Sequence, residues 1–316
     1  MMNTILNIYF SLPHDKALGI VSKAFNRVVA KIVKRYLDKT VPSYFLMTQG
    51  KYSNGLNTEK RDKEVIVSFT SFPGRIQDVW IVVECLFRQT YKADKIILWL
   101  SESQFEGIEL PKVLLEQQNR GLEIRFVEND LKSHKKYLYV INEFPNDYVI
   151  TVDDDLYFDN KLIENLIKLK IKYPDALPTN RAHFIQFNKK DDIELYAKWH
   201  HNYDLVKPSL LLVPTGGFGT LYESRQLNNS FDNHDLIKKL APHADDLWLK
   251  VQSILKDTPI ITNSKYNKDP ITVKSSQLEK LVSTNVLNGG NDEQLKSILE
   301  YFNLGNLEKY REANEK

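Results

Sequence analysis

The chain has 316 residues, of which 42% are hydrophobic and 27% are charged, and its formal net charge is +2. This composition is typical of a soluble globular protein, and no stretch approaches the roughly 20 apolar residues that span a membrane. The single cysteine, Cys85, excludes an internal disulfide, and its apolar neighbours predict a small buried side chain. The first residues lack the basic region and cleavage site of a signal peptide, so we expect a cytoplasmic protein.

The positive charge is concentrated at the N-terminus, where residues 1–62 carry ten Lys or Arg and four Asp or Glu. Residues 20–37 have helical periodicity with basic residues largely on one side, and the opposite side is apolar: Val21, Phe25, Val28, Val29, Ile32 and Tyr36. Two interpretations stay open, a peripheral helix on an anionic membrane surface or a helix docked on its own domain. Residues 48–62 are polar and rich in turn formers, as expected of a linker.

From residue 64 onward, short apolar runs alternate with amphipathic stretches. We predict strands at 64–69, 95–100, 122–127 and 148–152, and helices at 76–89, 110–121, 134–144 and 161–173. The alternation predicts an α/β fold with a mostly parallel sheet flanked by helices. Because ligands of such sheets bind beyond the carboxyl ends of the strands, the loops that follow these strands are expected to share one crevice.

Two of these loops carry groups that suit an anion. Residues 70–75, TSFPGR, form a turn before a helix that can hold a phosphate or ribose, although an ordinary turn is the competing interpretation. Residues 128–136, ENDLKSHKK, bring Asp130, Lys135 and Lys136 to the same edge. The chain has no G-x-G-x-x-G and no P-loop lysine motif, so the usual dinucleotide and NTPase fingerprints are absent.

Three consecutive aspartates, Asp153, Asp154 and Asp155, follow the fourth strand directly. Adjacent carboxylates repel each other, so a cation is expected to lie among them. Alternation along the strand places Asp153 and Asp155 on one side, which suits Mg²⁺ or Mn²⁺. The competing interpretation is an acidic loop that caps the next helix.

Two later segments complete the pattern. Residues 214–222, PTGGFGTLY, contain three closely spaced glycines, which indicate a sharp bend or a close approach by a ligand. Residues 242–255 place Asp245 and Asp246 at the start of a helix, where they can act as partners of the helix dipole or supply a general base.

Taken together, the segments TSFPGR, ENDLKSHKK, ITVDDDLYF, PTGGFGTLY and HADDLWL resemble those of bacterial glycosyltransferases with the GT-A fold. The resemblance is to family-2-like enzymes of capsular and surface polysaccharide synthesis, and it covers residues 64–295. It implies a Rossmann-like GT-A domain at 63–263, preceded by a helical extension and linker at 1–62. A C-terminal helical segment at 264–316 would pack on this domain.

The resemblance also implies the roles of individual residues. Asp153 and Asp155 correspond to the Asp-x-Asp pair that holds Mn²⁺ or Mg²⁺, and Asp246, with Asp245 beside it, to the catalytic base. The family pattern has Glu at the position of Asp245, which is a departure. The expected nucleotide-sugar site comprises Thr70, Ser71, Arg75, Asp130, Lys135, Asp153, Asp154, Gly216 and Gly217.

The implied reaction moves a sugar from a nucleotide-sugar, with UDP-sugars expected first, to a glycan or lipid-linked glycan, with inversion at the anomeric carbon. A metal held by two carboxylates neutralises the leaving diphosphate, and a carboxylate takes the proton of the acceptor. Two alternatives remain, a sugar-phosphate nucleotidyltransferase and a non-catalytic carbohydrate-binding protein. Nucleic acid is not an expected partner, because no basic face carries interleaved aromatic residues.

Overall fold

The computed structural model describes residues 1–12, 15–52, 54–200, 207–263, 269–273, 289–305, 307 and 310, and for residues 15–23 it describes the backbone alone. The α-helices are α1 (Met2–Ser11), α2 (Asp15–Thr48), α3 (Val79–Phe87), α4 (Glu102–Phe105), α5 (Lys112–Glu116), α6 (Lys135–Glu143), α7 (Leu162–Lys172), α8 (His234–Leu240), α9 (Asp245–Ile254) and α10 (Gly290–Tyr301). Short 3₁₀ helices are η1 (Gln49–Tyr52), η2 (Gln117–Arg120), η3 (Lys132–His134), η4 (Tyr196–Lys198), η5 (Gly216–Phe218) and η6 (Ser224–Gln226).

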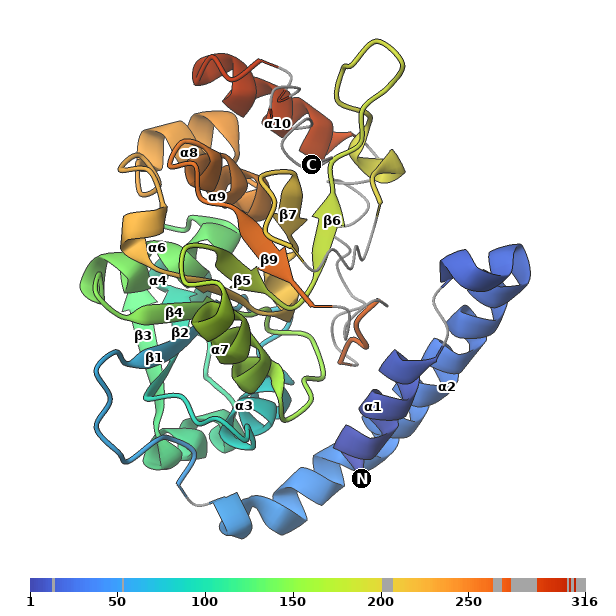
Figure 1. Cartoon of the computed structure of the whole chain (residues 1–316). Coiled ribbons are helices and arrows are strands. Elements are labelled where there is room, and N and C mark those ends of the chain that lie inside the picture. Colours follow the sequence, from blue (N-terminus) through green and yellow to red (C-terminus); the bar gives the residue numbers. More distant parts are fainter. Residues whose placement is uncertain are drawn as a thin grey trace.

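The strands are β1 (Val65–Thr70), β2 (Lys95–Ser101), β3 (Leu122–Val127), β4 (Tyr148–Thr151), β5 (Leu177–Thr179), β6 (Ala182–Phe184), β7 (Leu212–Pro214), β8 (Thr220–Tyr222) and β9 (Ile260–Thr262). In the described part of the chain, seven of them form one sheet in the order β3-β2-β1-β4-β8-β5-β9 (Figure 1). Only β8 runs antiparallel to its neighbours, so the sheet is mostly parallel. The predicted α/β fold class is confirmed.

Alternation along the parallel strands separates two apolar cores. Val67 and Phe69 of β1 pack on one side of the sheet with α3 and α7, whereas Ile66 packs on the other side with α6 and α9. Residues of β2 divide in the same way, with Ile96 and Leu98 on the first side and Ile97 on the second. Because β1 and β2 are covered on both faces, their sequences are apolar almost throughout, whereas the edge strand β3 is only partly buried.

The helices and strands predicted between residues 64 and 173 are all present, with shorter helices than expected. α3 begins at Val79 because residues 73–78 form turns, and the helix expected at 110–121 is divided into α5 and η2. Gly121 ends η2 with a φ of 106°, a backbone conformation that glycine adopts easily. Cys85 is buried as predicted, and burial raises the pKa of its thiol to about 12.

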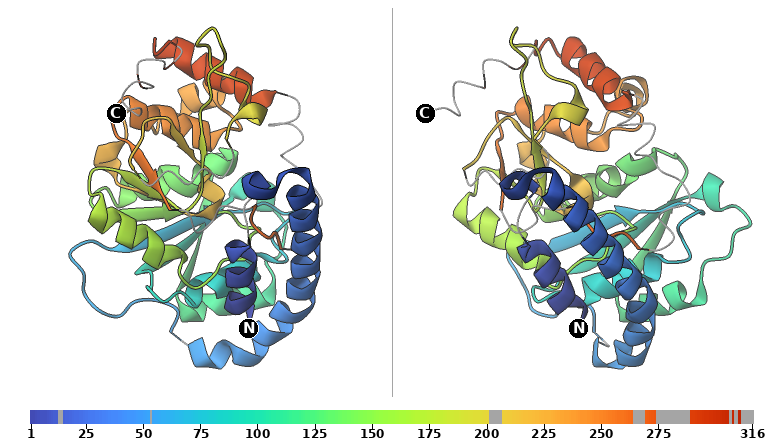
Figure 2. Two further views of the ribbon diagram at one scale, coloured as in Figure 1. Left: turned by 45° about the vertical axis from the view of Figure 1, so that its right-hand side comes forward. Right: turned by 90° about the vertical axis from the view of Figure 1, so that its right-hand side faces the viewer.

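The N-terminal helices α1 and α2 lie side by side along one side of the molecule (Figure 2). Leu6 and Phe10 of α1 and Leu37 of α2 belong to the same apolar core as β1 and α3. At the other end of the chain, α10 packs against α8 and α9. Among the described residues, no helix is both long enough and apolar enough to cross a membrane.

Candidate functional site

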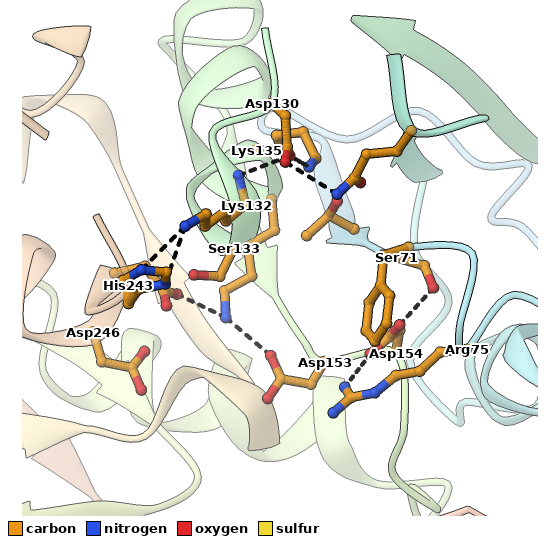
Figure 3. Close-up of a pocket in the computed structure, with 15 residues that line it drawn as sticks. Ser71, Arg75, Asp130, Lys132, Ser133, Lys135, Asp153, Asp154, His243 and Asp246 are labelled. Atoms are coloured by element: carbon orange, nitrogen blue, oxygen red, sulfur yellow. Dashed lines mark hydrogen bonds and ion pairs between the residues drawn. The ribbon is translucent and has the colours of Figure 1, made fainter. Parts of the chain in front are cut away.

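A cavity of about 360 Å³ opens beyond the carboxyl ends of β1 and β4, the edge where the sequence predicts a shared crevice (Figure 3). Its walls come from the loops after β1, β3 and β4, from α4, and from the starts of α6 and α9. The lining residues are Thr70, Ser71, Phe72, Arg75, Gln104, Asp130, Lys132, Ser133, Lys135, Lys136, Asp153, Asp154, His243, Asp245 and Asp246.

The loop after β1 contacts the aspartates that follow β4. β1 and β4 are neighbouring parallel strands, so their ends lie side by side. Ser71 Oγ donates to Asp154 Oδ2 over 2.5 Å, and Arg75 Nη1 lies 2.8 Å from Asp154 Oδ1 and 3.1 Å from Asp155 Oδ2. One guanidinium therefore serves two adjacent carboxylates. Simple alternation does not describe this loop, because β4 already ends at Thr151.

Burial dominates the electrostatics of these two aspartates. It raises the pKa of Asp155 to about 7, because the opposing effect of Arg75 is offset by the charges of Asp154 and Asp153. Burial also raises the pKa of Asp154, although Arg75 and the hydroxyl of Ser71 act in the opposite direction. Without additional positive charge, this side of the cavity disfavours full ionisation of its carboxylates.

Lys136 connects the two acidic sides of the cavity. Its side chain is 5% exposed, and Nζ lies 2.9 Å from Asp153 Oδ1 and 2.8 Å from Asp245 Oδ2. Burial alone would lower the pKa of Lys136, but Asp153, Asp245 and Asp246 hold it well above its ordinary value. Lys136 is therefore a fixed positive charge between the end of β4 and the start of α9.

The loop after β3 contributes a further ion pair to the wall of the cavity. Lys135 Nζ pairs with Asp130, whose other carboxylate oxygen accepts from Gln104 Nε2 over 3.0 Å. The backbone N–H of Lys132 donates to Asp130 Oδ1 over 3.1 Å. Asp130 therefore orients the lysines of this loop, and Lys132 Nζ in turn lies 3.0 Å from His243 Nε2.

A buried histidine holds the start of α9 in place. His134 Nε2 donates to the carbonyl of Ala241 over 2.7 Å, and its Nδ1 accepts from the Tyr137 hydroxyl at 2.8 Å. Burial lowers the pKa of His134 to about 4, so the imidazole is neutral near pH 7, and a neutral ring that donates from Nε2 accepts at Nδ1. The contact fixes the turn that precedes Asp245 and Asp246.

Asp245 and Asp246 occupy the first turn of α9, where the helix dipole favours negative charge. Asp245 is buried, and burial alone would raise its pKa, but the combined effects of Lys136, His134 and a hydrogen bond from Ser133 lower it. Asp246 is half-buried and lines the cavity, with its carboxylate pointing toward the same opening as that of Asp153 (Figure 3).

Most of the residues that the sequence assigns to a site meet at this cavity: Thr70, Ser71, Arg75, Asp130, Lys135, Asp153, Asp154, Asp245 and Asp246. Asp155 and Gly217 are not among the residues that line it, and Gly216 lies outside the residues whose surroundings the structure describes. Asp155 forms an ion pair with Arg75. The carbonyl of Gly217 accepts a hydrogen bond from the backbone N–H of Asp153 over 3.1 Å. A Cβ at position 217 would lie 2.1 Å from Asp153 Oδ2, so glycine is needed for this close approach.

Sequence reasoning places Lys136 at this edge but gives it no partner, and it assigns no role to five other lining residues, namely Phe72, Gln104, Lys132, Ser133 and His243. Lys132 and Ser133 belong to the same loop as Asp130, and His243 precedes the acidic pair, so proximity in the chain is a signal for these three. Gln104 has no motif, but it follows β2, whose end was expected at the crevice. For Lys136, only the fold reveals that it connects two carboxylates.

The charges of the cavity fit a divalent cation. Five carboxylates line it, against the cationic side chains of Arg75, Lys132, Lys135 and Lys136, so a diphosphate would enter a site that is already negative on balance. The side chain of Asp153 is 42% exposed, so one of its carboxylate oxygens can rotate toward a bound cation. Asp155 would have to give up part of its contact with Arg75 in order to bind the same cation. No cluster of three or more His, Cys, Asp or Glu ligands occurs among the described residues. Mg²⁺ needs only one or two carboxylates when phosphates and water complete its shell.

No protein-family model matches the chain, and no curated protein matches its sequence. Among solved structures, CMP:2-keto-3-deoxy-manno-octonic acid synthetase in complex with CTP is similar at 14% identity and a TM-score of 0.38, covering 64% of this chain and 89% of the other. A mannosyltransferase from Pyrobaculum calidifontis in complex with GDP-Man and Mn²⁺ is similar at 11% identity and a TM-score of 0.43, covering 81% of this chain and 70% of the other. At these scores neither likeness carries an argument, and the α/β fold class rests on the order and direction of the strands themselves.

Proposed function

We propose that this protein is a glycosyltransferase that moves a sugar from a nucleotide-sugar to a glycan or lipid-linked glycan, as in bacterial surface polysaccharide synthesis. One observation carries the proposal: Asp153 and Asp246, from segments far apart in the chain, line the same cavity. Between these segments, the ammonium of Lys136 forms ion pairs with both Asp153 and Asp245. Such an arrangement offers, on one side, a carboxylate that suits the metal ion of a leaving diphosphate and, on the other side, a carboxylate for an acceptor hydroxyl.

The donor would lie along the loops after β1 and β3. Thr70 and Ser71 line the entrance for the nucleoside, and Arg75, Lys132 and Lys135 supply cations for its diphosphate. A divalent ion, Mn²⁺ or Mg²⁺, held by Asp153 and Asp155, would add Lewis-acid neutralisation of the leaving group when bound. A UDP-sugar is the first donor to examine, following the resemblance of the motifs.

Asp246 is the proposed general base. As the acceptor oxygen attacks the anomeric carbon, the bond from that carbon to the diphosphate breaks and Asp246 takes the hydroxyl proton. Attack from the side opposite the leaving group inverts the anomeric centre. Asp245 is a poorer candidate, because its carboxylate is buried and already paired with Lys136.

A donor screen tests this proposal. Purified protein would be incubated with UDP-, GDP-, CMP- and dTDP-sugars, with Mn²⁺ or with EDTA, while release of the nucleotide is followed. We expect metal-dependent release from one donor, lost in Asp153→Ala and retained in Asp235→Asn, an exposed acid of α8. Release of pyrophosphate from a nucleoside triphosphate and a sugar phosphate would instead identify a nucleotidyltransferase. Binding without turnover would identify a carbohydrate- or nucleotide-binding protein.

A further inference from the structure

The long helix α2 docks on the rest of the protein with one of its faces. Leu37, Val41 and Phe45 follow each other at four-residue spacing, and each is no more than 1% exposed. Polar contacts support the same face, because Lys34 Nζ donates to the carbonyl of Thr272 over 2.6 Å and Asp38 Oδ1 accepts from the Tyr157 hydroxyl over 2.9 Å. These contacts fix the position of α2, so its remaining faces are not needed for docking on the protein.

A second apolar row on α2 contacts solvent. Phe25, Val28, Ile32 and Tyr36 are 56%, 55%, 62% and 42% exposed, and their spacing of three, four and four residues places them on one side of the helix. The row extends over about 16 Å at the rise of an α-helix. The sequence predicts a single apolar face for residues 20–37, whereas the structure divides its apolar residues between an inner and an outer row. The side chain of Val21, also assigned to that face, lies outside the described residues.

A basic row runs beside the outer apolar row. Arg27, Lys31, Arg35 and Lys39 are all exposed and repeat every four residues. Between residues 24 and 48 the only acidic residue is Asp38, which lies 3.0 Å from Lys34 and faces the protein. The outer side of α2 thus combines large apolar side chains with uncompensated positive charge.

We propose that this outer face, defined by Phe25, Val28, Ile32 and Tyr36 with Arg27, Lys31, Arg35 and Lys39, binds the surface of a membrane that contains anionic lipids. The apolar row would enter the boundary between headgroups and acyl chains, and the basic row would contact lipid phosphates. A second copy of this chain fits less well, because pairing two such faces would bring their basic rows together. The inference does not depend on the reaction catalysed.

Contacts inside the protein connect this face to the cavity. α1 packs along α2, and the ring of Phe10 lies 5.7 Å from the ring of Phe218, centroid to centroid, in a T-shaped arrangement. Phe218 belongs to η5, whose Gly217 contacts Asp153. A membrane bound by α2 would therefore lie at a fixed position relative to the cavity, as a lipid-linked substrate requires.

Vesicle binding by the full chain tests the inference. We would measure cosedimentation with phosphatidylcholine vesicles and with vesicles that contain 30% phosphatidylglycerol, at low and at high salt. We expect binding to the anionic vesicles alone, weakened by salt. Lys31→Glu/Arg35→Glu should lower the partition coefficient about 30-fold or more, and Phe25→Ser/Ile32→Ser at least about tenfold.

The matched control is Ile171→Ser/Lys112→Glu, which changes an apolar side chain and a lysine that are both exposed elsewhere. It should bind vesicles as the wild type does, and circular dichroism should show all variants folded, since every changed residue is exposed. The inference would be overturned if the wild-type protein did not cosediment with anionic vesicles, or if all variants bound these vesicles equally well. A dimer that Phe25→Ser/Ile32→Ser converts to a monomer, without vesicle binding, would assign the face to self-association instead.

Discussion

The pKa values of the buried carboxylates shift in opposite directions on the two acidic sides of the cavity. Beyond β4, Asp154 and Asp155 share the single guanidinium of Arg75, and burial raises the pKa of both. At the start of α9, Asp245 lies beside the ammonium of Lys136, and its pKa is lowered although the residue is buried. Burial is common to both sides, so the ratio of cations to carboxylates decides the direction of the shift.

This difference suggests different tasks for the two sides. The Asp153–Asp155 side lacks positive charge and would gain from an added cation, which agrees with the proposed metal and donor site. The α9 side already has its charge compensated by Lys136 and the helix dipole, so an ionised base there needs no further partner. Single substitutions can disturb either side separately, or the lysine that connects them.

Loss of the proposed base should have the largest effect. Asp246→Asn keeps the shape of the side chain but cannot accept the acceptor proton, so we expect kcat to fall about 10²–10⁴-fold with little change in nucleotide binding. Steady-state kinetics and calorimetric titration of the nucleotide would measure the two quantities. Asp235→Asn serves as the control for losing an acid near a helix start. Full activity in Asp246→Asn would transfer the role to Asp245.

Removal of the connecting lysine should mainly lower stability. Lys136→Met leaves the carboxylates of Asp153 and Asp245 without their shared cation, and losing one partner of a buried ion pair costs about 3–5 kcal/mol. Urea denaturation would measure the loss. Lys168→Met, which removes an exposed lysine paired with Glu164, should cost about 0–1 kcal/mol. Equal losses in the two variants would mean that Lys136 does not hold the two sides together.

The close approach of η5 to Asp153 can be tested with a single methyl group. In Gly217→Ala the added Cβ would lie 2.1 Å from Asp153 Oδ2, so the carboxylate must move. A displacement of this size at a substrate-positioning group can cost about 10²-fold in rate. We expect that loss in kcat/KM for the donor, together with a higher Mn²⁺ requirement. Gly50→Ala, with nothing within 4 Å of its added Cβ, should match the wild type.

The last expected effect is a change in the pH dependence of stability. Between the ordinary carboxyl pKa near 4 and about 7, the folded chain retains a proton on Asp155 that the unfolded chain has lost. The contribution of Asp155 to stability therefore falls as the pH rises through this range. Asp155→Asn removes this dependence, so in EDTA the free energy of unfolding of the variant should increase relative to wild type between pH 4 and pH 8. A constant difference would mean that Asp155 is ionised throughout.

The first half of the sheet could be predicted closely from the sequence. β1, β2 and β4 are buried almost throughout and appear as apolar runs, whereas Glu123 and Arg125 alternate with apolar residues in the edge strand β3. The class of fold follows from the alternation of these strands with helical segments. The second half could not. β5, β8 and β9 are three residues long, too short for a recognisable period, and the antiparallel direction of β8 has no local signal.

By itself, the sequence determined which loops meet at the carboxyl edge of the sheet and which acids they carry, because strand order along the chain and side-chain type are local properties. The tertiary structure alone decided which cation each acid contacts. Lys136 pairs with Asp153 and Asp245 because β4, α6 and the start of α9 pack together, and no spacing in the chain encodes that contact. The two apolar rows of α2 follow the same rule: periodicity predicts an amphipathic helix, but only packing decides which row is buried and which remains at the surface.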